Sequence, residues 1–416
     1  MHRSSMFQIL LDQSRSKGAY LYDVRRDELV LDLFGQFSSL VLGYNHPIFD
    51  TDEFKTELLG ATGVKITNCE MATPEGERFL SDFSTHPSMS PFEHFHFACT
   101  GALAIETATK TAIDYRGSRE PIVITFKESF HGINGYGGIL TDRFGGANQR
   151  LEGFPGGYWG RPMDNPVIRY RDGEAVVDNE LTDRVLEEIR GAMRNDEDRN
   201  ICAVLLEPIQ CTAGDQYFDP RFPKGLREIC TEFDVPLIFD EVQSGFGGTG
   251  TLWYFEQCGV IPDIVAFGKK TQTSGIMVRE PFGKIFDRSV RLEVTWDGDL
   301  LDMIRCRYIL RAFREFNILE NVRTCGVYIN EYLSDLPLIK NVRNSGLLIA
   351  FDFESKAERD EYAKGMRERR VIVLPSQEQT IRWRPHLAFS IEDADVAINS
   401  SRAALRALSY KQEQVG

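Results

Sequence analysis

The sequence lacks three features that would each place it in a special class of protein. None of its eight cysteines forms a C-x-x-C pair, and several stand inside apolar runs such as "ICAVLLEP", which argues against a zinc site or a disulfide framework. No apolar run approaches the roughly 18 residues of a membrane-spanning helix. The N-terminal "MHRSSMFQILLDQSRSKG" lacks the apolar core of a signal peptide. These absences predict a cytoplasmic protein that does not span a membrane.

Positive charge is also scarce. The chain has 48 Lys and Arg residues against 62 Asp and Glu residues, a formal net charge of -14. An acidic surface repels a nucleic-acid backbone, so nucleic acid is not an expected partner. What is present, 42% hydrophobic and 26% charged residues, is ordinary for a globular protein, and 416 residues suffice for one large domain with a smaller one attached.

Apolar runs alternate with amphipathic segments through the first three quarters of the chain. This alternation predicts a mostly parallel sheet covered by helices on both faces, an α/β fold. The predicted strands are 121–126, 201–210, 236–241 and 263–269, and the predicted helices are 101–117, 179–195, 221–235 and 300–333.

The two ends of the chain have a different pattern. Residues 20–43 alternate around "RRDE", which predicts a hairpin leading into an extended segment. After residue 333 the chain predicts a small α+β domain, with strands at 346–353, 370–376 and 380–389 and helices at 356–369 and from 392. The glycine-rich and aromatic segment 137–162 is predicted to be a long functional loop.

Two charged residues follow buried strands in a way that suggests a site. Asp240 ends one apolar run and Lys269 follows the next, and ligands of open parallel sheets sit beyond the carboxyl ends of the strands. A lysine that forms a Schiff base and an aspartate that keeps a pyridine nitrogen protonated are what pyridoxal phosphate requires. From these residues alone, the alternative is that Asp240 and Lys269 form a structural ion pair or are two unrelated charges.

The other requirements of this cofactor also find candidates. Thr100, Gly101 and Ala102 stand between a strand-like "HFHFAC" and a helix, where amide groups and the helix dipole can hold a phosphate. Phe130 and His131 follow the "PIVITF" strand, and Phe130 offers a flat partner for the ring. Taken singly, each is also compatible with a plain turn, core packing or an ordinary loop histidine.

Together, these segments resemble a known family. The resemblance is carried through nearly the whole chain by "LDLFGQFSSLVLGYNHP", "TGALAIETATKTA", "SFHG", "LLEPIQ", "FDEVQSGFGGTG", "PDIVAFGKKTQ", "VTWDGDLLDMIRCRYIL" and "TIRWRPHLAFS". The chain resembles the class III aminotransferases of fold type I, and within them the L-lysine 6-aminotransferases. The resemblance implies a seven-stranded sheet in a large domain at residues 46–320. It also implies a small domain made of the terminal segments 1–45 and 321–416.

The resemblance also implies roles for the cofactor residues. Lys269 would carry the Schiff base with pyridoxal 5'-phosphate and move the proton, with Lys270 the less favoured alternative. Asp240 would bind the ring nitrogen and Gln243 the phenolic oxygen, while Phe130 would stack on the ring. Thr100, Gly101 and Ala102 would hold the phosphate, with His131 beside the ring. Thr295 would reach the phosphate of the other subunit, which implies an obligate homodimer with shared active sites.

The resemblance further implies how substrates bind. Arg382 would take a substrate carboxylate, with Arg384 in reserve. Glu207 would neutralise Arg382 while an amine donor is bound and swing away for the keto acid, because an unpaired buried arginine is costly. The implied reaction moves a terminal amino group from a lysine-like donor to an α-keto acid such as 2-oxoglutarate, in ping-pong order.

Some positions depart from the family. Lysine 6-aminotransferases have an arginine after F-H-G that grips the distal carboxylate, and here that residue is Ile133. Loss of such a buried contact costs about 2–5 kcal/mol. Asp297 and Asp299 replace glycine and asparagine, and Cys211 replaces a glycine. A paralogue in specialised metabolism, whose donor has no distal carboxylate, is therefore an alternative. A racemase, aminomutase or decarboxylase reaction, and a non-catalytic binding role, also stay open at this point.

Overall fold

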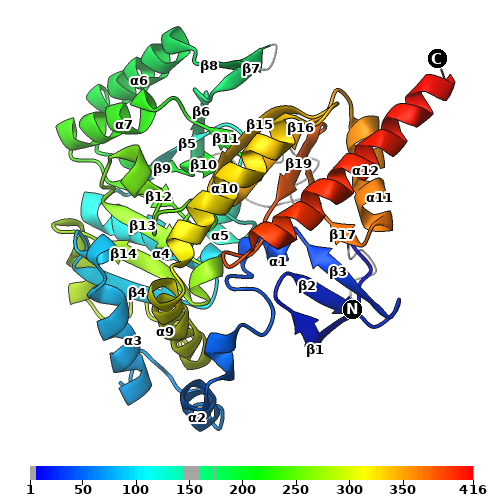
Figure 1. Ribbon diagram of the computed structural model, residues 1–416. Coiled ribbons are helices and arrows are strands. Elements are labelled where there is room, and N and C mark those ends of the chain that lie inside the picture. The colour runs from blue at the N-terminus through cyan, green and yellow to red at the C-terminus, as the bar shows by residue number, and fades with distance from the viewer. Residues whose placement is uncertain (1–5, 144–159, 172–173, 416) are drawn as a thin grey trace. The chain divides into compact units, whose positions relative to one another are not determined.

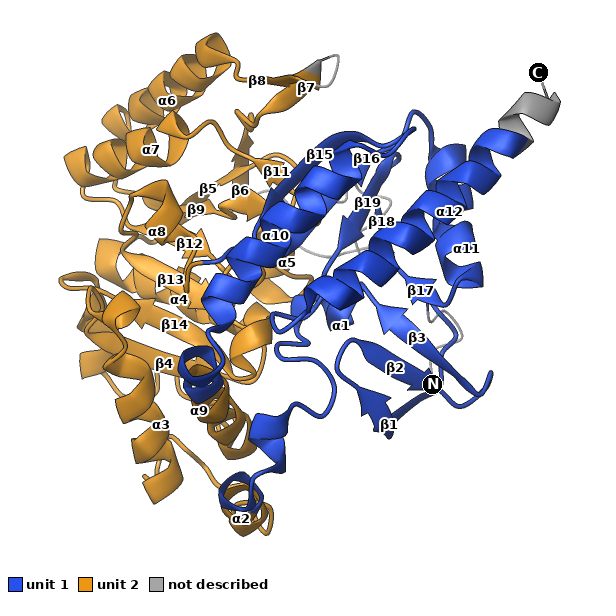
Figure 2. Cartoon of the chain, in the orientation of Figure 1, with its two compact units in different colours: residues 1–55, 247–250, 311–416 blue, residues 56–246, 251–310 orange. Residues whose placement is uncertain are grey.

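The computed structural model of the protein describes residues 6–143, 160–171 and 174–415 (Figure 1). The chain divides into two compact units (Figure 2). Unit 1 comprises Met1–Lys55, Gly247–Gly250 and Arg311–Gly416, and unit 2 comprises Thr56–Phe246 and Thr251–Leu310. No helix within the described ranges is long and apolar enough to cross a membrane.

Unit 2 is built on a seven-stranded sheet with the strand order β4-β14-β13-β12-β9-β5-β6. Neighbouring strands from β13 to β6 pair in parallel, and only β14 runs antiparallel to both of its neighbours. The mostly parallel sheet is therefore confirmed. The strands are β4 (His94–Ala98), β5 (Ile122–Phe126), β6 (Gly160–Met163), β9 (Ile201–Leu206), β12 (Leu237–Asp240), β13 (Ile264–Phe267) and β14 (Ser274–Val278).

Helix α4 (Gly101–Arg116) packs on this sheet through a face of small residues. Ala104, Ala108 and Ala112 are fully buried in one cluster with Ile238 and Ile264 of the central strands. Alanines let the helix lie close to the strands, which fixes where its N-terminus stands. The other helices that lie mainly in unit 2 are α2 (Asp52–Gly60), α3 (Pro74–Ser84), α5 (Gly135–Leu140), α6 (Asn179–Arg194), α7 (Arg221–Glu232), α8 (Phe255–Cys258) and α9 (Leu300–Glu315).

Short strands complete unit 2. The hairpin partners β7 (Arg169–Arg171) and β8 (Glu174–Val176) pair antiparallel, as do β10 (Ile209–Gln210) and β11 (Gln216–Tyr217). The predicted strand 201–210 thus consists of β9 and β10, separated by Glu207 and Pro208. Proline has no N–H to donate to a ladder, which explains the break.

Unit 1 joins the two ends of the chain. One sheet has the order β1-β2-β3-β17 and contains β1 (Leu11–Lys17), β2 (Tyr20–Asp23), β3 (Glu28–Asp32) and β17 (Val371–Ile372), so an N-terminal hairpin pairs with a C-terminal strand. The other has the order β15-β16-β19-β18 and contains β15 (Lys340–Ser345), β16 (Leu348–Asp352), β18 (Leu374–Ser376) and β19 (Thr380–Trp383). The predicted small terminal domain and the fold class are confirmed.

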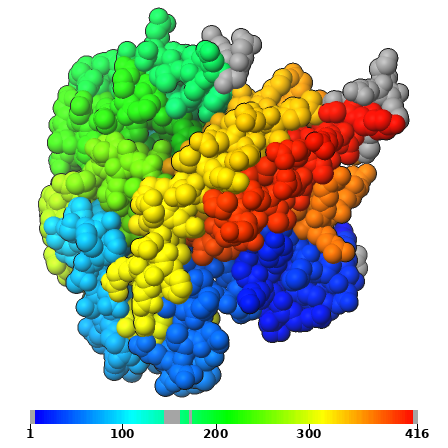
Figure 3. Space-filling view, viewed as in Figure 1, coloured from blue at the N-terminus to red at the C-terminus, as the bar shows by residue number. Residues whose placement is uncertain are grey.

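The long helices of unit 1 lie on its surface. Helices α10 (Ile318–Ser334) and α12 (Ile391–Val415) contact each other and appear as yellow and red bands in Figure 3. Helix α11 (Lys356–Glu368) packs against α12. The predicted helix 300–333 is two helices, because Asn317 adopts a left-handed backbone with φ 50° between α9 and α10.

Four further predictions were wrong in part. The extended segment after the hairpin contains the short helical turn α1 (Gly35–Ser38). The strand predicted at 380–389 ends at Trp383, shortly before Pro385. The strand predicted at 370–376 is divided between two sheets as β17 and β18. Part of the predicted loop 137–162 is helix α5, and its residues 144–159 lie outside the described residues.

Candidate active site

The sheet of unit 2 brings the two predicted strand-end charges to neighbouring strands. In the parallel pair β12–β13, Asp240 stands opposite Ala266, three residues before Lys269. The amide of Glu241 donates to the carbonyl of Ala266 at 2.8 Å, so the strands stay together to their ends. Asp240 and Lys269 therefore leave the sheet at the same edge.

A cavity of about 380 Å³ lies at this edge, within unit 2. Every predicted site residue except Thr295 and Arg382 lines it. The lining residues are Thr100, Gly101, Ala102, Ile105, Phe130, His131, Gly132, Ile133, Asn134, Glu207, Asp240, Val242, Gln243 and Lys269. A buried aspartate, a lysine and a helix N-terminus thus surround one small space.

Asp240 is held by two donors. Its Oδ1 accepts the amide of Val242 at 3.1 Å, and its Oδ2 lies 2.8 Å from Nδ1 of His131. Because a carboxylate only accepts, Nδ1 of His131 carries the proton. His131 is itself fixed, since its amide donates to the hydroxyl of Thr141 at 2.8 Å. The carboxylate is therefore oriented by groups on two different segments.

The N-terminus of helix α4 forms the second wall. Thr100 is the N-cap residue, and its hydroxyl oxygen accepts the amide of Ala102 at 3.2 Å. The hydroxyl proton of Thr100 is left for another acceptor. A Cβ on Gly101 would lie 2.7 Å from Cγ1 of Val242, so only glycine allows this close approach. Helix dipole and cap together make this corner suitable for an anion.

The two consecutive lysines have different surroundings. Lys269 lines the cavity and has a left-handed backbone with φ 55°, which is uncommon for a residue other than glycine. Lys270 is buried, and its Nζ donates to the carbonyl oxygens of Gln243 at 2.6 Å and Gly245 at 3.2 Å. Backbone strain concentrated at one lysine agrees with a functional constraint there.

Thr295 and Arg382 stand apart from the cavity lining. Thr295 is exposed on the segment before Trp296 in unit 2. Arg382 is buried on β19 of unit 1, where it pairs with Ala350 and Leu374. Its neighbour Arg384 donates from Nη1 to the carbonyl oxygens of Ile349 and Trp383, which gives that guanidinium structural partners.

The two aspartates that depart from the family are both engaged. Oδ2 of Asp299 lies 2.9 Å from Nζ of Lys65. Burial opposes ionisation of Asp299, but the Lys65 ammonium, the Leu301 amide and the charge of Arg305 together outweigh it, and the pKa of this carboxyl lies below its usual range. Oδ1 of Asp297 accepts the amide of Val294 at 3.0 Å. The charge of Asp299 is therefore compensated by Lys65, whereas burial raises the pKa of the Asp297 carboxyl above its usual range.

Sequence reasoning missed four residues of the lining: Ile105, Gly132, Asn134 and Val242. It also missed Glu106, which does not line the cavity. Glu106 Oε2 accepts the amide of Tyr136 at 2.8 Å at the start of α5. The helical spacing between Ala102 and Ile105 was the available signal, because residues three apart share a face. Val242 follows Asp240 by two residues and belongs to the same strand end.

Comparison with known proteins agrees with this geometry. The model of the family "Aminotransferase class-III" matches residues 2–405. The chain belongs to the class III aminotransferases. It is 36% identical to the L-lysine-epsilon aminotransferase of Mycobacterium tuberculosis over 95% of this chain and 92% of that protein. It is 32% identical to the L-lysine-epsilon aminotransferase of Streptomyces clavuligerus over 97% of this chain and 92% of that protein.

A solved structure gives the same answer for the fold. The lysine aminotransferase from M. tuberculosis in its internal aldimine form superposes with a TM-score of 0.90, at 34% identity, over 98% of this chain and 97% of that one. This class III aminotransferase thus has the fold type I architecture and depends on pyridoxal 5'-phosphate, with an amine donor and a keto acid as substrates. A buried carboxylate, an amine and a capped helix N-terminus around one cavity fit that cofactor.

Proposed function

We propose that this aminotransferase moves the terminal amino group of a lysine-like amine to an α-keto acid such as 2-oxoglutarate. The observation that carries the proposal is the lining of one cavity by Lys269, Asp240, Glu207 and Ile133. The first two fit the cofactor. Glu207 supplies a carboxylate for the donor half-reaction, and Ile133 marks the position where donor specificity is set.

Each cofactor role is assigned to a residue of the lining. When bound, pyridoxal 5'-phosphate supplies an electron sink for the carbon that loses the amine. Asp240, oriented by His131 and Val242, holds negative charge at the ring nitrogen. Thr100, Gly101 and Ala102 hold the phosphate at the α4 N-terminus. Phe130 would stack on the ring, and Gln243 would donate to its phenolic oxygen.

Lys269 is the amine that would hold the cofactor aldehyde and would move the substrate proton. Its place in the cavity lining supports this assignment. Lys270 is a poor alternative, because its Nζ already donates to two backbone carbonyls in a buried position. An ammonium in that position stabilises the 243–245 turn and is not free to exchange protons with a substrate.

Glu207 and Arg382 form the proposed switch between the two half-reactions. Glu207 follows β9 and is buried at the cavity, and Arg382 is buried on β19. The family resemblance assigns Glu207 as the carboxylate partner of this arginine when the donor carries none near the reacting carbon. Arg384 is less suited to this role, since its guanidinium donates to the carbonyls of Ile349 and Trp383.

A second candidate substrate follows from Ile133. This side chain is 66% exposed and lines the cavity beside Ile105 and Phe130. An isoleucine offers no charge to a distal carboxylate, whereas it packs well against an apolar chain. An amine donor with a neutral or apolar far end, such as a diamine or an alkylamine, is therefore the alternative to lysine.

The proposed assembly is a homodimer with shared active sites. Unit 2 exposes apolar side chains on two linked segments, with Val64 71%, Met71 64%, Val290 84% and Trp296 46% exposed. Asn68 donates to the carbonyl of Asp297 at 3.1 Å, which ties the segments together. Exposed apolar patches of this kind mark interfaces. Thr295 is exposed next to Trp296, which supports its proposed contact with a cofactor phosphate of the partner.

Two further predictions stand with this proposal. The domain division at residues 45/46 and 320/321 is retained as the division between a large cofactor domain and the terminal segments. A cytoplasmic location is supported by eight cysteines that are all free, since reduced thiols suit a reducing compartment.

Isotope labelling tests the proposed function. The cofactor-loaded enzyme would be incubated with 2-oxoglutarate and lysine labelled with nitrogen-15 at either the ε or the α amine. The proposal expects label in glutamate from the ε position only. Transfer of the α label would contradict it. Transfer from labelled 1,5-diaminopentane but from neither lysine would support the second candidate.

A further inference from the structure

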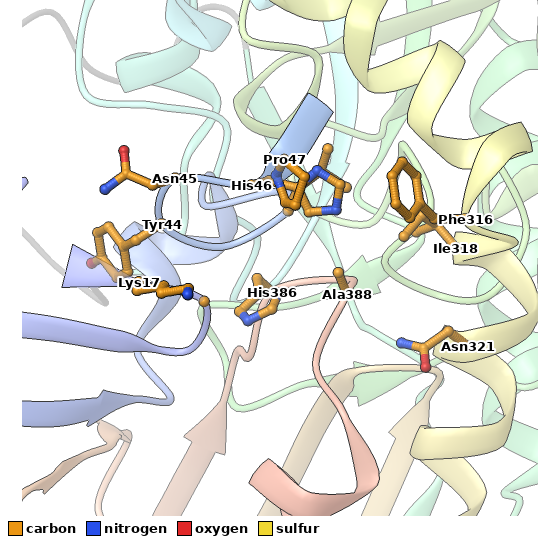
Figure 4. A pocket seen from close by; sticks show the side chains of 12 residues that line it. Lys17, Tyr44, Asn45, His46, Pro47, Phe316, Ile318, Asn321, His386 and Ala388 are labelled. Carbon is orange, nitrogen blue, oxygen red and sulfur yellow. The ribbon is translucent and has the colours of Figure 1, made fainter. Parts of the chain in front are cut away.

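A second cavity, of about 440 Å³, lies entirely within unit 1 (Figure 4). It has no residue in common with the candidate active site. Its lining is formed by Lys17, Gly18, Leu42, Tyr44, Asn45, His46, Pro47, Phe316, Ile318, Asn321, His386 and Ala388. Its size falls in the range of about 300–1,000 Å³ that is typical of small-molecule sites.

His386 is the unusual residue of this cavity. Its side chain is buried at 2% exposure, and neither ring nitrogen has a hydrogen-bond partner in the described part of the chain. A buried polar group without a partner costs free energy, so native proteins rarely leave one. In Figure 4 its ring lies between Lys17 and Tyr44 on one side and Asn321 and Ala388 on the other. Each ring nitrogen exposes less than 1 Å², so contact with a bound molecule requires a small shift of the ring.

The backbone makes room for this ring. Gly43 has φ +84°, and a Cβ there would come within 2.9 Å of His386 Nε2 and 2.7 Å of the carbonyl oxygen of Gly18. The amides of Gly18 and Tyr44 exchange hydrogen bonds of 2.8 and 2.9 Å, which fixes this wall. Burial and the nearby His46 lower the pKa of His386 to about 3. The ring is therefore neutral and presents one N–H and one lone pair.

His46 adds a second oriented donor. Its Nδ1 accepts the amide of Ile48 at 3.2 Å, so the proton of the neutral ring is on Nε2. Phe316 packs edge-on against this imidazole with ring centroids 4.8 Å apart. Asn321 donates both amide hydrogens, to the carbonyls of Leu387 at 2.8 Å and Phe389 at 3.0 Å, which leaves its side-chain oxygen as an acceptor.

The lining selects for the charge of an occupant. It contains the ammonium of Lys17 and two imidazoles, but no Asp or Glu, so a cation has no counter-charge there. One permanent positive charge matches a single negative charge better than a phosphate dianion. Leu42, Pro47, Phe316 and Ile318 add apolar surface to the lining. A metal ion is not favoured, because no cluster of three ligating side chains occurs among the described residues.

We propose that the unit 1 cavity binds a small organic monocarboxylate with a short aromatic or branched apolar body. The carboxylate takes hydrogen bonds from His386 and His46 and the charge of Lys17. The body packs against Phe316 and Ile318. This inference is independent of the amine donor proposed above, since none of these residues lines the first cavity.

Crystals of the cofactor-loaded enzyme grown with 4-bromobenzoate test the position directly, because bromine gives an anomalous signal. The expected result is a bromine peak beside Phe316, with the carboxylate within hydrogen-bond distance of a His386 ring nitrogen. A bromine peak only in the first cavity, or a cavity in unit 1 that holds water alone on His386, would overturn the proposal.

Calorimetry with benzoate tests the chemistry. Lys17→Met should weaken binding up to about 5-fold, as for an exposed ion pair. His386→Leu should weaken it about 10- to 100-fold, as for a buried bond to a charged group. Ala388→Leu, which fills the cavity, should abolish it, and Lys364→Met, an exposed lysine outside the lining, should have no effect.

Ligand analogues complete the test with the same wild-type enzyme. Benzamide, the neutral isostere, and benzylamine, the cation, should bind at least 10-fold more weakly than benzoate. Equal binding of all three compounds, or unchanged benzoate affinity in both Lys17→Met and Ala388→Leu, would show that the cavity does not select a carboxylate.

Discussion

At the scale of single residues, only a few partner groups hold each functional side chain of the site in place. Asp240 is oriented by the amide of Val242 and by His131, and His131 is held in turn by Thr141. Lys269 lies beside a second lysine whose ammonium donates to backbone carbonyls. The residues proposed to react and the residues that hold the structure around them are thus neighbours with different partners. Substituting them one at a time therefore distinguishes the two roles.

His131 should act as a positioning residue for Asp240. His131→Leu removes the donor at 2.8 Å from Asp240 Oδ2, and we expect cofactor affinity and turnover to fall about 10- to 100-fold, as for other residues that orient a ligand. His131→Asn places an amide N–H near the position of Nδ1 and should recover most of the loss. Absorbance titration with pyridoxal phosphate measures the affinity. Equal affinity of wild type and His131→Leu would contradict this role.

The two lysines should separate chemistry from stability. Lys269→Ala should lower turnover at least about 100-fold, the usual minimum for a lost proton carrier, with little change in unfolding. Lys270→Met should retain turnover per folded molecule but lose about 1.5–3 kcal/mol of unfolding free energy, because its buried Nζ donates to two carbonyls. Turnover and urea unfolding of both variants give the answer. The reverse pattern would assign the chemistry to Lys270.

At the scale of elements, the position of α4 decides whether its N-terminus can hold a phosphate. The helix packs through its alanines, and Gly101 touches Val242 where a Cβ would lie 2.7 Å from Cγ1. The glycine therefore allows the helix end and the strand end after Asp240 to approach each other. This contact joins the N-terminus of α4, which suits an anion, to the strand end that carries Asp240.

The Gly101–Val242 contact gives a prediction with an internal rescue. Gly101→Ala should push the helix end away and weaken cofactor binding about 10-fold, through an overpacking cost of about 1–3 kcal/mol. Combining it with Val242→Ala should restore binding, because that change removes the methyl group in the way. Gly191→Ala, at a helical glycine with open space, is the control. A double variant no better than Gly101→Ala alone would disprove the contact's role.

Elements were easier to predict than their ends. The runs that became β5, β12, β13, α4, α6 and α7 carry a clear period or a continuous apolar stretch, and the structure confirms them. The breaks at Pro208 and Asn317 depend on one residue's backbone and were missed. The division of 370–376 between two sheets depends on pairing with β3, which is distant in sequence.

The same contrast holds at the candidate site. Asp240, Lys269 and Thr100 could be predicted because they stand at strand and helix ends, where the type of residue is informative. Val242 and Glu106 could not, because their relevance arises from contacts across segments. The second cavity, around His386, joins residues more than 300 positions apart in sequence, from Lys17 to Ala388, and no local pattern predicts it.

At the scale of the whole molecule, buried histidines make stability depend on pH. Burial and His46 lower the pKa of His386 to about 3, whereas an unfolded histidine titrates near about 6.5. Between these values the unfolded chain binds the extra proton, so stability is full above pH 6.5 and falls as the pH drops. The slope from this group approaches about 1.4 kcal/mol per pH unit.

Urea unfolding between pH 7 and pH 4 measures this dependence. His386→Leu should flatten the slope relative to wild type, since it removes the proton taken up on unfolding. Identical slopes for the two proteins would mean that His386 does not hold a depressed pKa in the folded state.

The proposed homodimer can be tested by mixing inactive subunits. Lys269→Ala removes one site's amine, and Thr295→Asp should repel a phosphate at the partner's site. If sites are shared, each mixed dimer contains one intact site, and random mixing restores about a quarter of the wild-type activity. Absence of any recovery in a mixture shown to exchange subunits would place both residues in the same chain's site.

The most direct test of the account is a half-reaction spectrum. The yellow absorbance of the cofactor-loaded enzyme would be followed as L-lysine or 1,5-diaminopentane is added without a keto acid. We predict that at least one of these ω-amines removes the absorbance in a single turnover and that 2-oxoglutarate restores it. Loss of the absorbance with lysine would mean that another residue binds the distal carboxylate in place of the arginine that Ile133 replaces. Loss of the absorbance with the diamine alone would mean that Ile133 has changed the donor. Unchanged absorbance with both amines would contradict the proposed reaction.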